Sequence, residues 1–475
     1  QASLKNTITR LFYTLPYQAS MNAMKIRMEN IFPGMVGLQH GRSLLALYHL
    51  LLDKKDTPKS AAIEAKWARK LANLNYPPVR IFSPYQMLKG MYRLKGYEAL
   101  LTDYYEAAFI FDEIHAYEVN RLAMILKTIE YLSHNFKAVF MVMSATFPAL
   151  VKKWIHQVLG DPAEITAVEA LFKQFQRHTL VLLHGELLSE QGLEYIVRDA
   201  ITGKSVLVVC NLVDRAQRAY CELQKRLNDK EIHVELLHAR FNMRDRLAKE
   251  KIVREATGSS SNQRRAIVLV ATQVIEVSLD IDLDTIYTDP APLEALVQRF
   301  GRVNRRRTQR DLAPVHVFHQ MDNSYQIYDN ELVSRALSIL ERNNGTPLEE
   351  NAVDGWLNEI YSGEVAASWE DKYNHAAREF EETCIKALRP FAADHSMEEK
   401  FYNTFDSIEV LPLPLLEEFS TLKEEDPIQA SELLVPISWK RYYSLQKKGL
   451  AGRQEGITPP VVRATYNSKS GLIFE

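Results

Sequence analysis

Two adjacent carboxylates, Asp112 and Glu113, end an apolar run in the stretch AAFIFDEIHAYE, and His115 follows two positions later. The run Ala107–Phe111 shows no polar alternation, which predicts a parallel strand covered on both faces. Ligands of open α/β sheets lie beyond the carboxyl ends of such strands. Two acids there suit a magnesium–nucleotide site, in which one holds the ion and the other orients an attacking water. The alternative is a surface turn that happens to contain Asp-Glu.

A second strand-like run closes on small hydroxyl residues. The apolar run Ala138–Met143 predicts another buried strand, and Ser144 and Thr146 follow it. Hydroxyls at such a strand end can hydrogen-bond the preceding acids and relay their state to another domain. Because Ser and Thr end strands in many proteins, this motif carries weight only together with the acids upstream.

A further set of polar residues lies between AIVLVATQ and VQRFGRVNRRR. The predicted strand Ile267–Val270 leads to Asp280, and a predicted helix then carries Gln298, Arg302 and Arg305. The spacing predicts that the two arginines lie one turn apart on the same side of that helix. Guanidinium groups so placed can clamp a γ-phosphate. The alternative is a basic helix face that is solvated or touches nucleic-acid phosphates.

These motifs together resemble those of the superfamily-two helicases, in which two RecA-like lobes share ATP across their cleft. FIFDEIHAYE, MSATFP, VATQVIEVSLDIDLD and LVQRFGRVNRR, with YTLPYQASMNAM and GLQHGRS upstream, are similar to the helicase part of the CRISPR-associated type I helicase–nucleases, which Cascade recruits. The resemblance covers about residues 10–310. It implies an ATP-dependent, cytoplasmic translocase on single-stranded DNA with ATP and Mg²⁺ as cofactors.

Residue roles follow from the resemblance only where this sequence matches the motifs. In the implied ATP site Asp112 would hold Mg²⁺, Glu113 would activate water, and His115, Ser144, Thr146, Asp280, Gln298, Arg302 and Arg305 would complete or couple the site. The implied contacts to a DNA strand are Pro16, Ser83, Asn211, His238, Arg240 and Thr272.

The phosphate loop of the family, GxxxxGK[ST], does not occur in the sequence. The only GK[ST] is Gly203-Lys204-Ser205, which lacks the earlier glycine and precedes a predicted strand instead of following one. We therefore expect a helix-to-strand turn there. The strand leading into the missing loop is expected inside the first sheet. Because several unsatisfied backbone groups at ~1–3 kcal/mol each exceed a domain's margin of ~5–15 kcal/mol, we expect an upstream segment or another chain to fill that slot.

A nuclease signature is also absent, since no His-Asp dipeptide occurs among the 13 histidines. We therefore expect this polypeptide to move along DNA without cutting it, while an HD-type nuclease domain or subunit supplies the cleavage. Two alternatives stay open. One is a DEAH-type RNA helicase, and the other is a nucleic-acid-binding, helicase-like module that does not hydrolyse ATP.

The elements that must position these residues follow from the alternation of apolar runs and amphipathic stretches. That alternation indicates an α/β fold with two parallel-sheet lobes, at residues 1–160 and 161–325. The resemblance implies that both lobes are RecA-like and that the first lacks its phosphate-loop segment. Residues 326–475 are expected to form a mainly helical C-terminal accessory domain. Its tail, WKRYYSLQKKGLAGRQ, predicts either a grip on single-stranded DNA or a solvated helix with one tyrosine in the core.

Composition sets wider limits. A chain of 475 residues with 46% hydrophobic and 25% charged residues is typical of a globular protein with more than one domain. A net charge of −2 means that any nucleic-acid surface is a local patch. The three cysteines are scattered and form no CxxC, which argues against a structural zinc or a disulfide framework and favours the cytoplasm.

Overall fold

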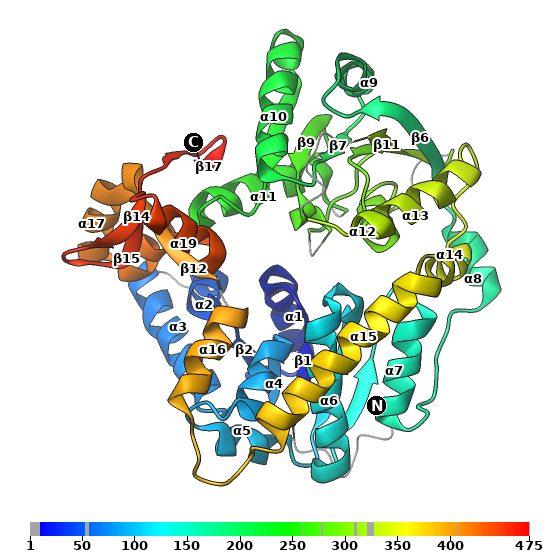
Figure 1. Ribbon diagram of the computed structural model, residues 1–475. Coiled ribbons are helices and arrows are strands. Elements are labelled where there is room, and N and C mark those ends of the chain that lie inside the picture. The colour runs from blue at the N-terminus through cyan, green and yellow to red at the C-terminus, as the bar shows by residue number, and fades with distance from the viewer. Residues whose placement is uncertain are drawn as a thin grey trace. The chain divides into compact units, whose positions relative to one another are not determined.

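The computed structural model describes residues 10–52, 57–259, 261–276, 279–307, 311–320, 327–405 and 407–474. Residues 277 and 278, within the VATQVIEVSLDIDLD motif, lie outside these ranges. The chain forms two compact units (Figure 1). The first contains the chain up to Ile165 together with Tyr361–Ser407, and the second contains Thr166–Ile360 together with the chain from Ile408. None of the helices in the described ranges combines the length and apolarity that a membrane span needs.

The first unit is built on a parallel sheet with the strand order β2-β3-β1-β4-β5. Its strands are β1 (Leu11–Thr14), β2 (Val36–Gln39), β3 (Val79–Phe82), β4 (Ala108–Phe111) and β5 (Val139–Val142). The register places Thr14 beside Phe111 and Phe111 beside Val142. The residues that follow β4 and β5 therefore emerge together at one edge of the sheet.

Strand β5 differs from the buried strand that the sequence predicted. Val139 and Met141 are 51% and 49% exposed, because β5 lies at the edge of the sheet within the described residues. Among the described strands, no interior slot of the kind expected for a missing strand is seen either. Each of these five strands hydrogen-bonds directly to its neighbours, and β2 and β5 form the two edges.

A helix from the C-terminal third completes the first unit. Helix α15 (Gly363–Phe380) lies beside α6 (Val119–Phe136) (Figure 1). Tyr373 of α15 stacks on Trp154, with ring centroids 4.1 Å apart, and belongs to the same apolar core. The accessory domain expected at residues 326–475 is therefore divided between the two units.

The second unit contains a six-stranded parallel sheet with the order β6-β11-β10-β7-β9-β8. Its strands are β6 (His178–Glu186), β7 (Val206–Val209), β8 (His233–Leu237), β9 (Ile267–Ala271), β10 (Thr285–Thr288) and β11 (Ala313–Gln320). The helices between these strands include α9 (Glu190–Ile201), α10 (Val213–Leu227), α11 (Met243–Thr257) and α12 (Leu293–Phe300). Together with the first sheet, this arrangement confirms the predicted fold of two parallel α/β lobes.

The GK[ST] triplet lies where α9 gives way to β7. Gly203 has a φ of 88°, and Lys204 Nζ lies 2.9 Å from Asp199 Oδ1 of the preceding helix. Ser205 N donates to Asp284 Oδ2 over 2.7 Å. The predicted helix-to-strand turn is confirmed, and its lysine is paired with a carboxylate.

The C-terminal part is helical at first and then mixed. Helices α13 (Asn330–Arg342), α14 (Ala352–Ile360), α15 and α16 (His395–Phe405) confirm the helical prediction. Beyond them lies a small sheet with the order β13-β12-β15-β14. Its strands are β12 (Ile408–Pro412), β13 (Val435–Ile437), β14 (Ala451–Gln454) and β15 (Ile457–Val462). The sequence did not predict this sheet, because its strands are short and three of the four contain prolines, which usually mark strand ends and edges.

Candidate active site

Asp112 lies directly after β4, at the edge where the strand ends converge. Its backbone N–H donates to the Thr14 carbonyl over 3.1 Å, so β1 holds its position. Tyr13 Oη donates to Asp112 Oδ2 over 2.8 Å. Burial, together with this bond to a carboxylate, raises the pKa of Tyr13. The phenol therefore stays protonated and orients the Asp112 carboxylate. The sequence did not reveal Tyr13, because its partner is known only once β1 and β4 are seen to be neighbours.

Glu113 is held in an uncommon backbone conformation. Its φ is 58°, in the left-handed region that residues other than glycine rarely adopt. Such a conformation costs on the order of 1–3 kcal/mol and is concentrated at functional sites. The side chain is 46% exposed, and its Oε2 lies 3.4 Å from His115 Nε2. The strain therefore presents an exposed carboxylate beside Asp112.

His115 links the acids to the end of β5. Its side chain is 5% exposed, and its Nδ1 is hydrogen-bonded to Ser144 Oγ. Ser144 Oγ also donates to the Thr146 carbonyl over 2.7 Å. Burial lowers the pKa of His115 to about 4, because the charged imidazolium loses its contact with water. His115 therefore lies between Ser144 Oγ, which is bonded to its Nδ1, and Glu113, whose Oε2 faces its Nε2 over 3.4 Å. The sequence suggested a bond from Ser144 to the acids, but among the described residues Ser144 Oγ is bonded to His115 and Thr146.

The two carboxylates fit a nucleotide-bridged Mg²⁺ better than a metal centre of the protein's own. Within the described ranges, no three His, Cys, Asp or Glu side chains are grouped so that they could hold a metal ion. Mg²⁺ is usually bound through one or two carboxylates together with substrate phosphates. Asp112, with Glu113 beside it, offers that donor set.

In the second unit, α12 ends before the two predicted arginines. The helix stops at Phe300, and the chain turns at Gly301 and again at Asn304, whose φ is 45°. Arg302 and Arg305 therefore do not lie on one face of a helix, and that prediction was wrong. The three-residue spacing aligns side chains only while the helix continues.

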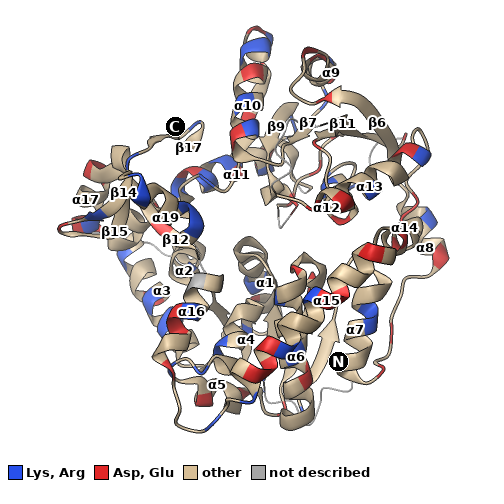
Figure 2. Ribbon diagram, in the orientation of Figure 1, with Lys and Arg blue, Asp and Glu red and all other residues tan. Residues whose placement is uncertain are grey.

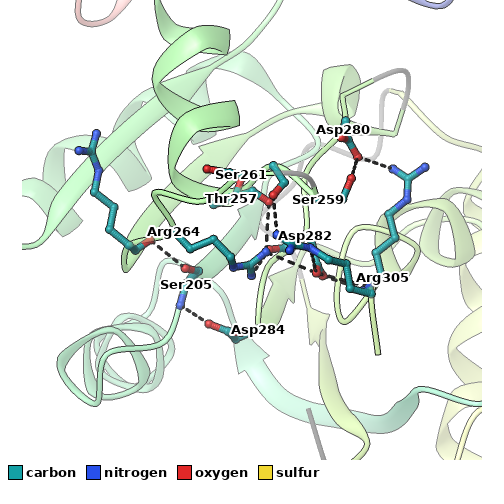
Figure 3. Close-up of polar contacts among 12 residues, drawn as sticks. Ser205, Thr257, Ser259, Ser261, Arg264, Asp280, Asp282, Asp284 and Arg305 are labelled. Atoms are coloured by element: carbon teal, nitrogen blue, oxygen red, sulfur yellow. Dashed lines mark hydrogen bonds and ion pairs between the residues drawn. The ribbon is translucent and has the colours of Figure 1, made fainter. Parts of the chain in front are cut away.

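The two arginines have different environments. Arg302 donates through Nη1 to the Leu279 carbonyl over 3.1 Å and through Nη2 to the Glu276 carbonyl over 2.6 Å. Arg305 has a side chain that is 41% exposed, and its Nη1 lies 3.7 Å from Asp280 Oδ1 (Figure 3). Arg302 therefore holds the segment before β10 in place, whereas Arg305 presents its charge to solvent.

Asp280 and Gln298 are the other two residues that the sequence predicted for this half of the site. Asp280 is 48% exposed and accepts a hydrogen bond from Ser259 Oγ besides its contact with Arg305. Gln298 lies on α12 and is partly buried. Both residues belong to the second unit, as the sequence predicted for the second half of the site.

A buried arginine beside these residues escaped the sequence prediction. Arg299 is fully buried, and its guanidinium donates to Glu276 Oε1 over 2.8 Å, to Thr288 Oγ1 over 2.8 Å and to Asn211 Oδ1 over 3.0 Å. It ties together the segments after β7, β9 and β10. A signal was present, since Leu296 three residues earlier faces the core and Arg299 shares that side of the helix.

Three of the residues predicted to contact DNA are buried. The Asn211 side chain donates to the Pro290 carbonyl over 2.7 Å as well as accepting from Arg299, and Thr272 is 3% exposed. His238 Nε2 is hydrogen-bonded to the Ser470 carbonyl in the hairpin β16 (Thr465–Asn467)–β17 (Gly471–Ile473) over 3.0 Å. Burial lowers the pKa of His238 to about 3. All three side chains are therefore buried, and those of Asn211 and His238 hydrogen-bond within the second unit, so none of the three is exposed for direct contact with DNA.

Of the other three predicted DNA contacts, Ser83 is also buried, whereas Pro16 and Arg240 lie closer to solvent. Pro16 follows β1 and is partly buried, and Ser83, at the end of β3, is 8% exposed. Arg240 is partly exposed and forms an ion pair with Asp214. Basic residues also mark α11 and the start of α19 (Trp439–Lys447) (Figure 2).

The basic C-terminal tail forms the helix with one tyrosine in the core that the sequence offered as one of two alternatives, and the grip on single-stranded DNA stays a prediction. In α19, Tyr442 is buried in a core cluster, whereas Tyr443 is 46% exposed. Tyr443 stacks on Trp439 with ring centroids 5.6 Å apart. The helix therefore has one tyrosine in the core and one exposed aromatic face beside lysine and arginine.

Comparison with known sequences connects this geometry to one group of proteins. A family profile described as CRISPR-associated nuclease/helicase Cas3, C-terminal, matches residues 202–308. The CRISPR-associated endonuclease/helicase Cas3 of Escherichia coli is 27% identical over 91% of this chain, which covers 57% of that protein. The CRISPR-associated nuclease/helicase Cas3 of Methanothermobacter thermautotrophicus is 24% identical over 76% of this chain, which covers 43% of that protein. The chain thus spans about half the length of these relatives.

Solved structures agree in fold. The crystal structure of T. fusca Cas3 with AMPPNP matches 98% of this chain at a TM-score of 0.75 and 17% identity, and this chain covers 65% of it. A chain of a CRISPR RNA-guided surveillance complex in a pre-nicking state matches 98% at a TM-score of 0.63 and 18% identity, with 64% of that chain covered. The resemblance to the helicase part of the CRISPR-associated helicase–nucleases is confirmed.

Proposed function

From the relation of this chain to the helicase portion of the Cas3 CRISPR-associated nuclease/helicases, we propose that it is an ATP-dependent single-stranded DNA translocase of type I CRISPR interference. One observation carries the enzymatic part of the proposal. Glu113, in a strained backbone beside Asp112, is connected through His115 to Ser144 at the end of the next strand. A surface turn would have no need of such a linked and partly buried set.

The residues of the first unit have distinct tasks in the proposed reaction. Asp112, oriented by Tyr13, would hold Mg²⁺, which when bound supplies positive charge beside the ATP phosphates. Glu113 orients the attacking water and takes up its proton at a carboxylate oxygen. His115 and Ser144 transmit the state of Glu113 to the segment around Thr146, which the resemblance assigns to coupling with nucleic acid.

In the second unit, Arg305 is the residue proposed to take up charge that develops on the transferred phosphate. Its guanidinium is exposed and has Asp280 as its ion-pair partner. Arg302 keeps the preceding segment folded through its bonds to two carbonyls. Asp280 and Gln298 are proposed to complete the ATP site, as the resemblance implies.

Substitution of the proposed base tests the enzymatic part. In the full-length gene product, Glu113→Gln should abolish ATP hydrolysis while ATP binding, measured with a fluorescent analogue, is kept. The matched control is Glu118→Gln, which removes a carboxylate that is 63% exposed and paired with Arg121. Hydrolysis by Glu113→Gln at a rate near that of the wild type would show that the base is misassigned. A wild-type protein without steady-state ATPase would favour the non-hydrolysing module.

The type of nucleic acid and the proposed partners are tested in separate assays. Strand displacement on matched DNA and RNA duplexes distinguishes the proposed DNA translocase from a DEAH-type RNA helicase. The proposed partners are single-stranded DNA, a Cascade-type surveillance complex and an HD-type nuclease domain or subunit, in the cytoplasm. Preparations without that nuclease are expected to leave circular single-stranded DNA intact with Mg²⁺, Mn²⁺, Co²⁺ or Ni²⁺. Metal-dependent nicking that survives Asp112→Ala would contradict this expectation.

A further inference from the structure

We propose that Asp282 is the positioning residue for Arg305, and that it acts by fixing the backbone of the turn that carries this arginine. The inference rests on the proposed ATPase function. Asp282 lies between Asp280 and β10, and its side chain is 2% exposed. The resemblance assigns it no role, and a buried carboxylate needs compensating partners.

The partners of Asp282 converge on the turn. Its Oδ1 accepts a hydrogen bond from the Arg305 backbone N–H over 2.7 Å, and its Oδ2 accepts one from the Arg306 backbone N–H over 3.4 Å (Figure 3). The side chains of Arg264 and Arg306 approach Oδ2 to 3.4 and 3.5 Å. One carboxylate thus binds two successive amides, and two guanidinium groups balance its charge.

The rest of the turn is anchored on the same segment. Leu283 N donates to the Arg302 carbonyl over 3.0 Å, and Asn304 N donates to the Leu283 carbonyl over 2.9 Å. The chain turns sharply at Asn304, with its φ of 45°. Without the Asp282 carboxylate, the backbone amides of Arg305 and Arg306 would lose the acceptor that holds the chain just after this sharp turn.

Asp280 orients the side chain of Arg305. Its carboxylate lies 3.7 Å from Arg305 Nη1, so the side chain of Arg305 is oriented by Asp280 while its backbone is fixed by Asp282. Asp284, at the same spacing further along, accepts from Ser205 N, just before β7. Asp284 is therefore the natural control for a carboxylate with a merely structural role.

A double-mutant cycle in the full-length gene product tests the proposal. Asp282→Asn is expected to lower the kcat for ATP at least about tenfold with KM unchanged, and Asp282→Ala to lower it further, because the amide oxygen of Asn can still accept from Arg305. In an Arg305→Ala background, Asp282→Asn should cause no further loss, whereas Asp284→Asn should leave the kcat per folded molecule unchanged. Losses that multiply in the double variant would overturn the proposal.

Hydrogen exchange provides a readout that does not depend on catalysis. Asp282→Ala should speed amide exchange in a peptide covering residues 302–307 by about tenfold or more, while Asp284→Asn should not. Unchanged exchange would overturn the positioning role even if the ATPase proposal holds. If the wild-type protein hydrolyses no ATP, the proposed function fails, and exchange alone decides whether Asp282 holds the turn.

Discussion

The strand-end site of the first unit and the arginine turn of the second unit reach their functional groups by different means. Asp112, Glu113 and Ser144 directly follow two neighbouring parallel strands, whose register brings their ends together. Arg302 and Arg305 follow a helix that has already ended, and each side chain goes where the surrounding carbonyls and carboxylates direct it. The position of a residue at the end of a strand can therefore be predicted from sequence. The orientation of a side chain in a turn depends on the groups that it contacts.

The largest expected effect separates the two arginines. Arg305→Ala should lower DNA-stimulated ATP hydrolysis roughly 10³-fold with little change in melting temperature, because its exposed guanidinium contributes to charge stabilisation and little to folding. Arg302→Ala should instead lower the free energy of unfolding by ~1–3 kcal/mol, because two carbonyls lose their donor. Steady-state kinetics and thermal melts measure both. Equal kinetic losses without any change in melting would show that Arg302 takes part in the reaction as Arg305 does.

A pH titration of stability compares two buried histidines, His115 in the first region and His178 near the second. Burial lowers the pKa of His115 to about 4, and it lowers the pKa of His178, whose Nε2 is bonded to the Val303 carbonyl over 2.8 Å, to about 4 as well. The folded state disfavours the protonated forms, so the unfolded chain takes up protons first. Stability should be fully retained above the ordinary value of 6.5 and lost as pH falls from 6.5 to about 4. The free energy of unfolding should fall by on the order of 3 kcal/mol for each histidine over this pH range.

Thermal melts across that pH range check the titration. Comparison of the wild type with His115→Gln and His178→Gln should show a flatter acid limb in each variant, in the unit that carries the substitution. A wild-type acid limb that neither substitution changes would contradict the neutral histidines.

A smaller effect is expected at the hairpin that covers His238. A Cβ on Gly471 would meet His238 Cε1 at 2.7 Å and the Arg240 carbonyl at 2.8 Å, and its φ is +71°. Gly471→Ala should therefore destabilise the second unit by about 1–3 kcal/mol. The matched control is Gly456→Ala, where φ is +77° and no atom lies within 4 Å of the added Cβ. Chemical denaturation should show a clearly larger loss at Gly471, and equal losses would mean that only the backbone conformation matters.

The smallest expected effect tests the hydrogen bond between Tyr13 and Asp112 in the first region. Tyr13→Phe removes the donor that orients Asp112, so kcat/KM for Mg²⁺–ATP should fall roughly fivefold, the equivalent of about 1 kcal/mol for one hydrogen bond. Tyr104→Phe is the control, because in the described residues the Tyr104 hydroxyl has no hydrogen-bond partner. If both variants keep wild-type activity over a range of Mg²⁺ concentrations, the Tyr13 bond has no part in the reaction.

Sequence alone determined the two parallel lobes and the position of two acids just after a strand, because buried parallel strands are continuous apolar runs and ligands lie beyond their ends. Asp112, Glu113 and His115 were predicted in this way, and the structure connects Glu113 through His115 to Ser144. The helical part of the C-terminal third was also predicted. Its amphipathic stretches are long enough to establish helix type without knowledge of their partners.

Only the tertiary structure decided what non-local contacts control. The end of α12 at Phe300, the burial of Arg299 and the inward turn of Arg302 depend on carbonyls and carboxylates contributed by residues 211–289. Tyr13 lies 99 residues before Asp112, and His238 is covered by a hairpin more than 220 residues later. Local sequence patterns carry no information about such partners. A side chain between charged neighbours is oriented by whichever groups the completed fold brings within hydrogen-bonding distance.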